Sequence, residues 1–227
     1  MKITDISGPI YTGMWNYSEP LNRILKDFNL SSIEFEFGGE KYTVDIFENM
    51  KAQTGTYLES PGQYLEDNQY TVSDIPVGKL HMMEARVLRV PYDRLGEKDG
   101  KRYVTLDDIK SAQQSVIPEG CAVLVGTGYG RYWERKDFFE SSWFFKKDAM
   151  DYLISKKPFL IGADSAEWEN PKNPEGIFKK LFPANILILA SCVNLELIEQ
   201  FSVKLTVLPL KVQKAYICPV RAVVVEG

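Results

Sequence analysis

The chain contains little histidine and little cysteine. Its 227 residues include a single histidine, His81, and three cysteines. Zinc sites use thiolate, imidazole and carboxylate ligands, so one imidazole excludes a site built mainly on histidine. A serine nucleophile needs an adjacent base, commonly histidine or lysine, and the chain has no Gly-x-Ser-x-Gly sequence. The composition therefore argues against both a histidine-rich metal site and a serine hydrolase of that type.

The three cysteines, Cys121, Cys192 and Cys218, stand far apart in apolar surroundings. An odd number without a recognisable spacing predicts buried, reduced thiols and not a disulfide framework.

Long hydrophobic runs, an excess of basic residues and a secretory leader are also absent. No apolar stretch reaches the roughly 18 residues that a membrane span needs. Lysine and arginine number 27 against 31 acidic residues, for a net charge of −4, whereas nucleic-acid binding needs a basic surface. The first residues lack a basic start, an apolar run and a small-residue cleavage site. We therefore expect a cytoplasmic protein with no nucleic-acid or membrane partner.

Hydrophobic residues make up 44% of the chain and supply a sizeable core. Residues 33–37 and 42–47 alternate apolar and polar side chains around Gly38-Gly39, which predicts a β-hairpin. Thr105 and Asp108 form a capping pair for a helix over 106–114, and a second helix fits Lys147–Ser155. Further strands are expected at 84–90, 122–125, 159–161, 186–189 and 222–225. No repeat or linker divides the chain, so residues 1–227 read as one α/β domain.

The most informative stretch is QTGTYLESPGQ, residues 53–63. Gly55, Thr56 and Pro61 stand where a tight loop needs special backbone conformations. The stretch resembles the signature His-x-Gly-Thr-His-x-Asp-x-Pro-x-His of the cyclase-like metal-dependent hydrolases, which include bacterial kynurenine formamidases and isatin hydrolases. Other segments resemble the same family in order and spacing: ITDISGPIYTGMWNYSEP near the start, VLVGTGYGRYW at 123–133, FLIGADSAEW at 159–168, ILILASCVNLELI at 186–198 and LPLKVQKAYICPVRAVVVE at the end.

The resemblance implies a swivelling β/β/α fold in a single domain, usually assembled as homodimers or homotetramers. In that family the first two histidines and the aspartate of the signature bind zinc or manganese, and the last histidine serves in acid–base chemistry. In this sequence those four roles fall on Gln53, Tyr57, Glu59 and Gln63.

Two further ligand positions of the family are also replaced. Ser142 stands where a histidine precedes a helix, and Ala190 aligns with a glutamate. Among all these positions only Glu59 is a strong ligand, and a single carboxylate with an amide and a hydroxyl makes a thin shell for zinc or manganese. The resemblance therefore predicts that the metal centre of the family is lost and that no cofactor is bound.

Glu59, Tyr57 and Gln63 are the candidate catalytic residues, with Glu59 as general acid or base and the other two orienting a substrate. Glu59 could instead accept backbone hydrogen bonds within its own loop, and Tyr57 and Gln63 could only fill space left by lost imidazoles. Candidate binding residues are Gln53, Ser142, Trp15 and Trp133. The two tryptophans sit in aromatic-rich loops that could line a pocket for a small planar ligand, or could bury those loops or a subunit interface.

The sequence therefore leaves three hypotheses about function. The first is a divergent cyclase-family hydrolase that acts without the metal centre on a small amide, lactone or carbonyl substrate, with genuine arylformamidase activity not expected. The second is a non-catalytic pseudoenzyme that binds a small ligand or a partner subunit through the retained scaffold. The third is retained metal chemistry with unusual ligands, namely Glu59, Gln53 and Ser142. Fold alone does not decide between them.

Overall fold

The structure is a computed structural model that describes residues 1–17, 21–64 and 70–227, without the side chain of Gln63. Its main sheet is built from the strands β1 Lys2–Asp5, β4 Tyr57–Glu59, β5 Met83–Arg89, β8 Ala122–Gly126, β10 Leu160–Ala163, β11 Leu187–Ala190, β12 Ser202–Pro209 and β13 Ile217–Glu226. They follow the order β1-β13-β12-β5-β8-β10-β11-β4, and β4 also pairs with β13.

That last pairing closes the sheet on itself. Along one edge β13 pairs with β12, and along the other its first residues pair with β4 and its last residues with β1. Leu58 in β4 lies opposite Leu189 of β11 on one side and Cys218 of β13 on the other. Seven strands, from β13 through β12, β5, β8, β10 and β11 to β4, therefore form a closed ring within the described residues.

The alternation of side chains along the strands separates two cores. One face of the strands carries a cluster that includes Leu58, Val87 and Leu124 and fills the interior of the closed sheet. The other face carries a larger cluster that includes Leu88 and Val125, and the helices pack against it. We call these the inner and the outer cluster.

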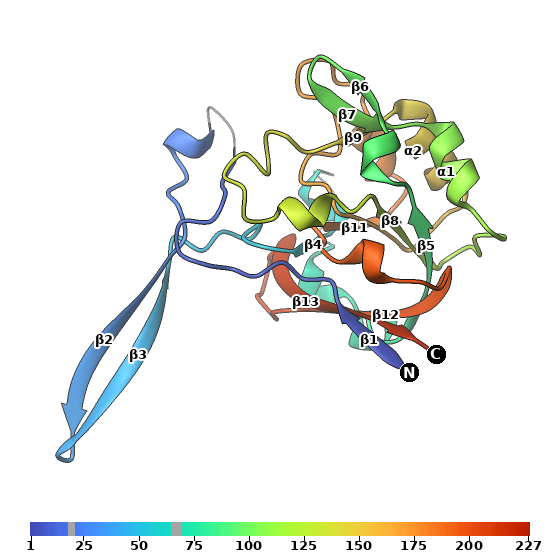
Figure 1. Cartoon of the computed structure of the whole chain (residues 1–227). Coiled ribbons are helices and arrows are strands. Elements are labelled where there is room, and N and C mark those ends of the chain that lie inside the picture. The colour runs from blue at the N-terminus through green and yellow to red at the C-terminus, as the bar shows by residue number, and fades with distance from the viewer. Residues whose placement is uncertain (18–20, 65–69) are drawn as a thin grey trace.

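The helices are α1 Leu106–Ala112, α2 Lys147–Ser155 and α3 Phe178–Leu181. They lie together on one side of the closed sheet (Figure 1), next to the parallel strands β5, β8, β10 and β11. The bounds predicted for α2 are confirmed. The predicted cap of α1 is also confirmed, because Thr105 Oγ1 accepts a hydrogen bond from Asp108 N. The prediction for α1 ran two residues too far, since Gln113 is extended.

Two smaller sheets stand outside the closed ring. One consists of β6 Gly96–Lys98, β7 Lys101–Val104 and β9 Phe144–Phe145. The other is the hairpin of β2 Asn29–Phe37 and β3 Glu40–Glu48, which projects from the body as a long arm (Figure 1). The predicted hairpin and the predicted α/β architecture are confirmed. In the part of the chain that the structure describes, no helix has the length and apolar character that crossing a membrane requires.

Candidate active site at the outer face of β4

The short strand β4 presents two of the candidate catalytic residues on one face. Leu58 points into the inner cluster, and because strand side chains alternate, Tyr57 and Glu59 point the other way. Tyr57 packs against the outer cluster, and its backbone partner in β11 is Ala190. The structure therefore brings together three positions that the sequence identified, namely Tyr57, Glu59 and Ala190, on the outside of the closed sheet.

The conformation and hydrogen bonds of the loop before β4 explain why Gly55 and Thr56 occur there. Gly55 has φ +79°, and a Cβ there would lie 2.8 Å from Ile10 Cγ1, so a side chain is unfavourable on both counts. Thr56 Oγ1 accepts a hydrogen bond from Gly8 N at 2.9 Å and donates one to Ser191 O at 2.8 Å. This hydroxyl therefore ties the loop to the segments that follow β1 and β11.

Glu59 is a buried carboxyl group in this loop-and-strand unit. The residue is 8% exposed, and among the described residues no hydrogen bond or ion pair to its carboxyl group occurs. Burial raises its pKa to about 7, from an ordinary value of 4.5. The hypothesis that its own loop satisfies the carboxylate therefore finds no support in these contacts, and the group is poised to gain or lose a proton near neutral pH.

Two phenol groups lie within electrostatic reach of Glu59. Burial first, and then the charge of Glu59, raise the pKa of Tyr17 and of Tyr57, and Tyr17 raises that of Tyr57 further. The hydroxyl of Tyr17 is buried without a hydrogen-bond partner among the described residues. A buried hydroxyl normally has such a partner, so this orphaned group next to a carboxyl points to an unfilled polar contact at the site.

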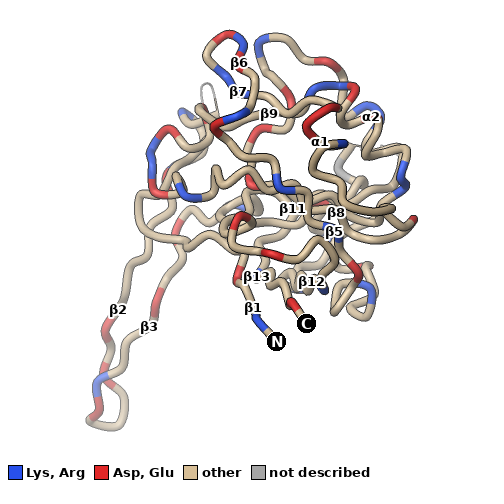
Figure 2. Tube along the Cα trace, turned by 45° about the vertical axis from the view of Figure 1, so that its right-hand side comes forward, with Lys and Arg blue, Asp and Glu red and all other residues tan. Residues whose placement is uncertain are grey.

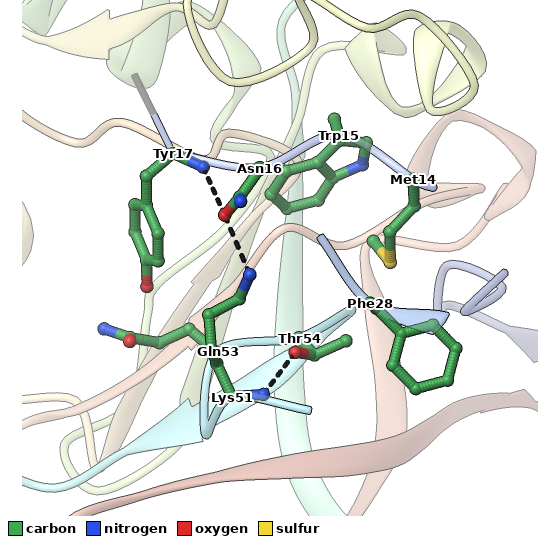
Figure 3. Close-up of a pocket in the computed structure, with 8 residues that line it drawn as sticks. All are labelled: Met14, Trp15, Asn16, Tyr17, Phe28, Lys51, Gln53 and Thr54. Atoms are coloured by element: carbon green, nitrogen blue, oxygen red, sulfur yellow. Dashed lines mark hydrogen bonds between the residues drawn. The ribbon is translucent and has the colours of Figure 1, made fainter. Parts of the chain in front are cut away.

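A small cavity lies beside Tyr17, between the loop after β1 and the loop before β4 (Figure 3). Its volume is about 10 Å³, the room for about one water molecule. Gln53 lines it, and Lys51 donates hydrogen bonds from Nζ to Asn16 Oδ1 at 2.8 Å and to Lys26 O at 3.0 Å. Gln53 thus lies near Tyr17 as a polar wall of this space, in keeping with its place among the candidate binding residues.

The aromatic candidates pack densely against one another. The rings of Trp15 and Trp133 meet edge to face with centroids 5.1 Å apart, and both residues are buried. Trp133 donates from Nε1 to Pro9 O at 2.8 Å, which supports the loop after β1. Trp15 lines the small cavity, and its Nε1 has no partner among the described residues. Trp15 therefore lines the small cavity, whereas Trp133 packs against Trp15 and does not line the cavity.

The ends of two parallel strands are locked together by Asp164. This fully buried residue follows β10, and its carboxylate accepts hydrogen bonds from the backbone N–H groups of residues 127, 128 and 129 after the neighbouring β8. Thr127 Oγ1 and Trp143 Nε1 also donate to it, at 3.0 and 3.1 Å. Five donors on one carboxylate fix the turn from which the aromatic loop emerges. The sequence analysis did not single this residue out.

Ser142 is placed in a buried hydrogen-bond network. Its Oγ lies 2.7 Å from Ser165 Oγ and accepts a hydrogen bond from Ala166 N at 2.8 Å. Ser165 O in turn accepts from Ser191 N at 3.2 Å, next to Ala190. The segments that carry the family's ligand positions thus meet in space, but the hydroxyl of Ser142 is occupied by the main chain of its neighbours.

The residues at this site do not fit a zinc or manganese ion of the family type. No group of three or more histidine, cysteine or acidic residues that could hold a metal occurs in the described parts of the chain. His81 is exposed and lies 3.2 Å from Thr206 Oγ1, on β12. Gln63 ends the short turn Pro61–Gln63, and its side chain lies outside the described residues.

Sequence reasoning did not select Tyr17, Asn16 or Lys51 as site residues. In the sequence Tyr17 is one aromatic among many, and nothing local distinguishes it. Lys51 stands two residues before Gln53, so adjacency to the signature could have suggested it. What singles out Tyr17 is its electrostatic interaction with Glu59, a residue 42 positions away in the chain.

Fold and site together define a mixed α/β domain with a closed sheet and a buried carboxyl group on the outside of its shortest strand. A family model described as "Putative cyclase" matches residues 4–170, well over half of the chain. The chain therefore belongs to the cyclase family. No curated protein matches it by sequence.

Solved structures with this fold include several hydrolases. A predicted metal-dependent hydrolase from Bacillus stearothermophilus shares 22% identity, with 98% of this chain and 97% of that chain covered and a TM-score of 0.72. An isatin hydrolase bound to the product analogue thioisatinate shares 19% identity over 98% and 91% of the two chains, with a TM-score of 0.81. Isatin hydrolase A from Labrenzia aggregata, bound to benzyl benzoate, shares 16% over 98% and 93%, with a TM-score of 0.80. At these identities they confirm the cyclase-type fold and nothing finer.

Proposed function

We propose that this protein is a divergent cyclase-family hydrolase that cleaves a small amide, lactone or related carbonyl substrate without the family's metal centre. The observation that carries the proposal is the state of Glu59: a buried carboxyl group with no described partner, beside the orphaned hydroxyl of Tyr17. An isolated buried carboxyl costs stability, and such costs concentrate at functional sites. The family fold and the retained loop frame around Gly55 and Thr56 support the same conclusion.

In the proposed reaction, the carboxylate of Glu59 takes a proton from a water molecule as that water adds to the carbonyl carbon. The hydroxyl groups of Tyr17 and Tyr57 donate hydrogen bonds to the oxyanion that forms on the carbonyl oxygen. The proton held by Glu59 then passes to the leaving nitrogen or oxygen as its bond to carbon breaks. Gln53 orients the substrate, and Gln63 has the same role on sequence grounds alone.

The proposal is tested with a panel of small amides, lactones and N-formyl compounds. We expect turnover in the wild type that Glu59→Gln reduces at least about 100-fold, the usual contribution of a general base. Its kcat/KM should rise with pH through about 7, because the active form of Glu59 is the carboxylate. The matched control is Glu119→Gln, the same chemical change at an exposed ion pair with Lys157, which should keep wild-type turnover.

Two results would contradict this proposal. Turnover that survives Glu59→Gln in a folded protein would remove Glu59 from its role. Near-stoichiometric zinc or manganese after purification without chelator, with activity lost on its removal, would favour the unusual ligand set of Glu59, Gln53 and Ser142 instead.

A second candidate is a non-catalytic protein that binds a small ligand at the same site. The unpartnered Nε1 of Trp15 and hydroxyl of Tyr17 favour it, because both can donate to an acceptor on a ligand. The small cavity holds only about one water, so such a ligand would have to displace side chains around it. A metabolite that raises the melting temperature of the wild type but not of Tyr17→Phe, with no turnover of any compound, would support this function.

A further inference from the structure

A second and larger cavity opens at the edge of the closed sheet where β12 ends and β5 begins. Its volume is about 340 Å³, within the range of sites that bind small molecules. Two single-turn helices, Val72–Asp74 and Val77–Lys79, form one wall, and the end of β12 with the loop after it forms the other. Eight of the eleven lining residues are apolar, and none of them belongs to the candidate active site.

The floor of this cavity is part of the hydrophobic interior of the closed sheet. Val72, Ile75 and Leu80 are almost fully buried and belong to the inner cluster. Val77 and Leu210 lie at the rim, with exposed fractions of 66% and 60%. The mouth of a closed sheet is a common place for a ligand, because an apolar interior meets solvent there. The cavity thus offers apolar surface from its floor to its rim.

Hydrogen bonds between the two walls hold the cavity in shape. Val207 N in β12 donates to Leu80 O at 2.9 Å, and Val72 N donates to Ala215 O, in the loop after β12, at 2.9 Å. Pro76, between the two single-turn helices, restricts its own backbone angle φ. A ligand therefore enters a preformed site and does not have to order its walls, which lowers the cost of binding.

The cavity is lined by two charged side chains that differ in their partners. Thr71 donates from N and Oγ1 to Asp74 Oδ2, at 2.9 and 2.7 Å, and these bonds lower the pKa of Asp74. Lys211 is exposed and has no hydrogen bond, ion pair or ring contact with a described residue. Figure 2 shows acidic and basic residues interspersed over the body, so an anion here is attracted by Lys211 itself and not by a broad positive field.

We propose that this cavity binds a small carboxylic acid with an apolar body. The hydrocarbon part displaces water from the apolar floor and walls, and the carboxylate pairs with Lys211 Nζ at the rim. The carboxylate of Asp74 is already engaged by Thr71 within its own turn, so Lys211 decides the charge of the ligand. The inference goes beyond the proposed function and holds whether or not Glu59 is catalytic, because the two sites share no residue.

Calorimetric titration of the full-length protein with sodium octanoate tests the proposal. We expect one site per chain and a negative heat-capacity change, because apolar surface is buried. Lys211→Gln should raise the dissociation constant about 5-fold, the contribution of an ion pair at an exposed rim. The matched control is Lys214→Gln, the same change in the same loop but outside the cavity, which should bind as the wild type does.

A second pair of variants tests the apolar wall. Val77→Asp places a carboxylate on that wall and should raise the dissociation constant for octanoate at least about 30-fold. Because Val77 is exposed, the change leaves the core intact. Val116→Asp makes the same change at another exposed valine that does not line the cavity, and it should keep wild-type affinity.

Four results would overturn the proposal. One is the absence of octanoate binding up to millimolar concentrations, and another is equal affinity of the wild type and Lys211→Gln. Octylammonium bound as tightly as octanoate would show that Lys211 does not select the ligand. Octanoate binding that is lost in Glu59→Gln but kept in Val77→Asp would place the ligand at the candidate active site instead.

Discussion

At the scale of single residues, the burial of Glu59 distinguishes the candidate site. Its carboxyl group is buried on the outer face of β4, and no described residue neutralises or hydrogen-bonds it. Asp164, by contrast, is fully buried but accepts five hydrogen bonds. Burial raises the pKa of both acids, to about 6 for Asp164 and about 7 for Glu59, and hydrogen bonds counteract the effect only at Asp164. The donors around Asp164 make it a structural anchor.

The raised pKa of Glu59 predicts a pH-dependent stability. Because its folded-state pKa of about 7 exceeds the ordinary 4.5, the folded protein binds this proton more tightly than the unfolded chain. The stabilisation is complete below about pH 4.5 and is lost as the pH rises through about 7. The loss amounts to something on the order of 3 kcal/mol.

Urea unfolding at a series of pH values measures this effect. In Glu59→Gln the slope of unfolding free energy between about pH 4.5 and 7 should flatten relative to the wild type, since the titrating group is gone. Glu119→Gln removes an exposed carboxylate and should leave the slope unchanged. Identical pH profiles for the wild type and Glu59→Gln would show that the carboxyl group is not buried as described.

At the scale of secondary-structure elements, β4 is the part that organises the site. Three residues long, it bridges β11 and β13 and so closes the sheet. The loop before it is held by Thr56, whose hydroxyl joins Gly8 N and Ser191 O. The retained Gly55-Thr56 pair is thus explained by backbone geometry and hydrogen bonding, independently of any metal.

Replacing the hydroxyl of Thr56 should therefore destabilise the protein. Thr56→Val keeps the shape of the side chain but leaves Gly8 N without its acceptor, which should lower the free energy of unfolding by about 1–3 kcal/mol. Thr43→Val, an equal change at an exposed position of β3, should stay within about 0.5 kcal/mol of the wild type. Chemical denaturation of both variants checks this; equal stability would show that the Thr56 bonds contribute nothing.

At the scale of the whole molecule, the closed sheet holds the candidate site in place. Leu58 of β4 lies opposite Leu189 of β11 and Cys218 of β13, so the strand that carries Glu59 is paired on both sides. The arm of β2 and β3 stands outside this ring.

Local sequence patterns determined the elements that need no distant partner. Alternation around Gly38-Gly39 predicted the hairpin, and the Thr105 cap and helical spacing predicted α1 and α2, because such preferences act between close neighbours. The strands β4, β6, β7, β9 and β12 and the short helix α3 went unpredicted. The equally short β10 and β11 were predicted because they are continuously apolar, whereas β4, β6 and β7 contain polar residues and too few alternations. The eight-residue strand β12 was overlooked.

The candidate site likewise has a part that the sequence identified and a part that only the tertiary structure revealed. The sequence by itself identified Tyr57 and Glu59 and showed that imidazole ligands are missing, since residue types are read directly from the chain. Only the tertiary structure brought Tyr17 within electrostatic reach of Glu59 and buried the carboxyl group. The physical reason is that the whole hairpin of β2 and β3 separates Tyr17 from Glu59 along the chain. Their proximity and the burial of the carboxyl group depend on contacts between distant segments, and a local sequence pattern does not record such contacts.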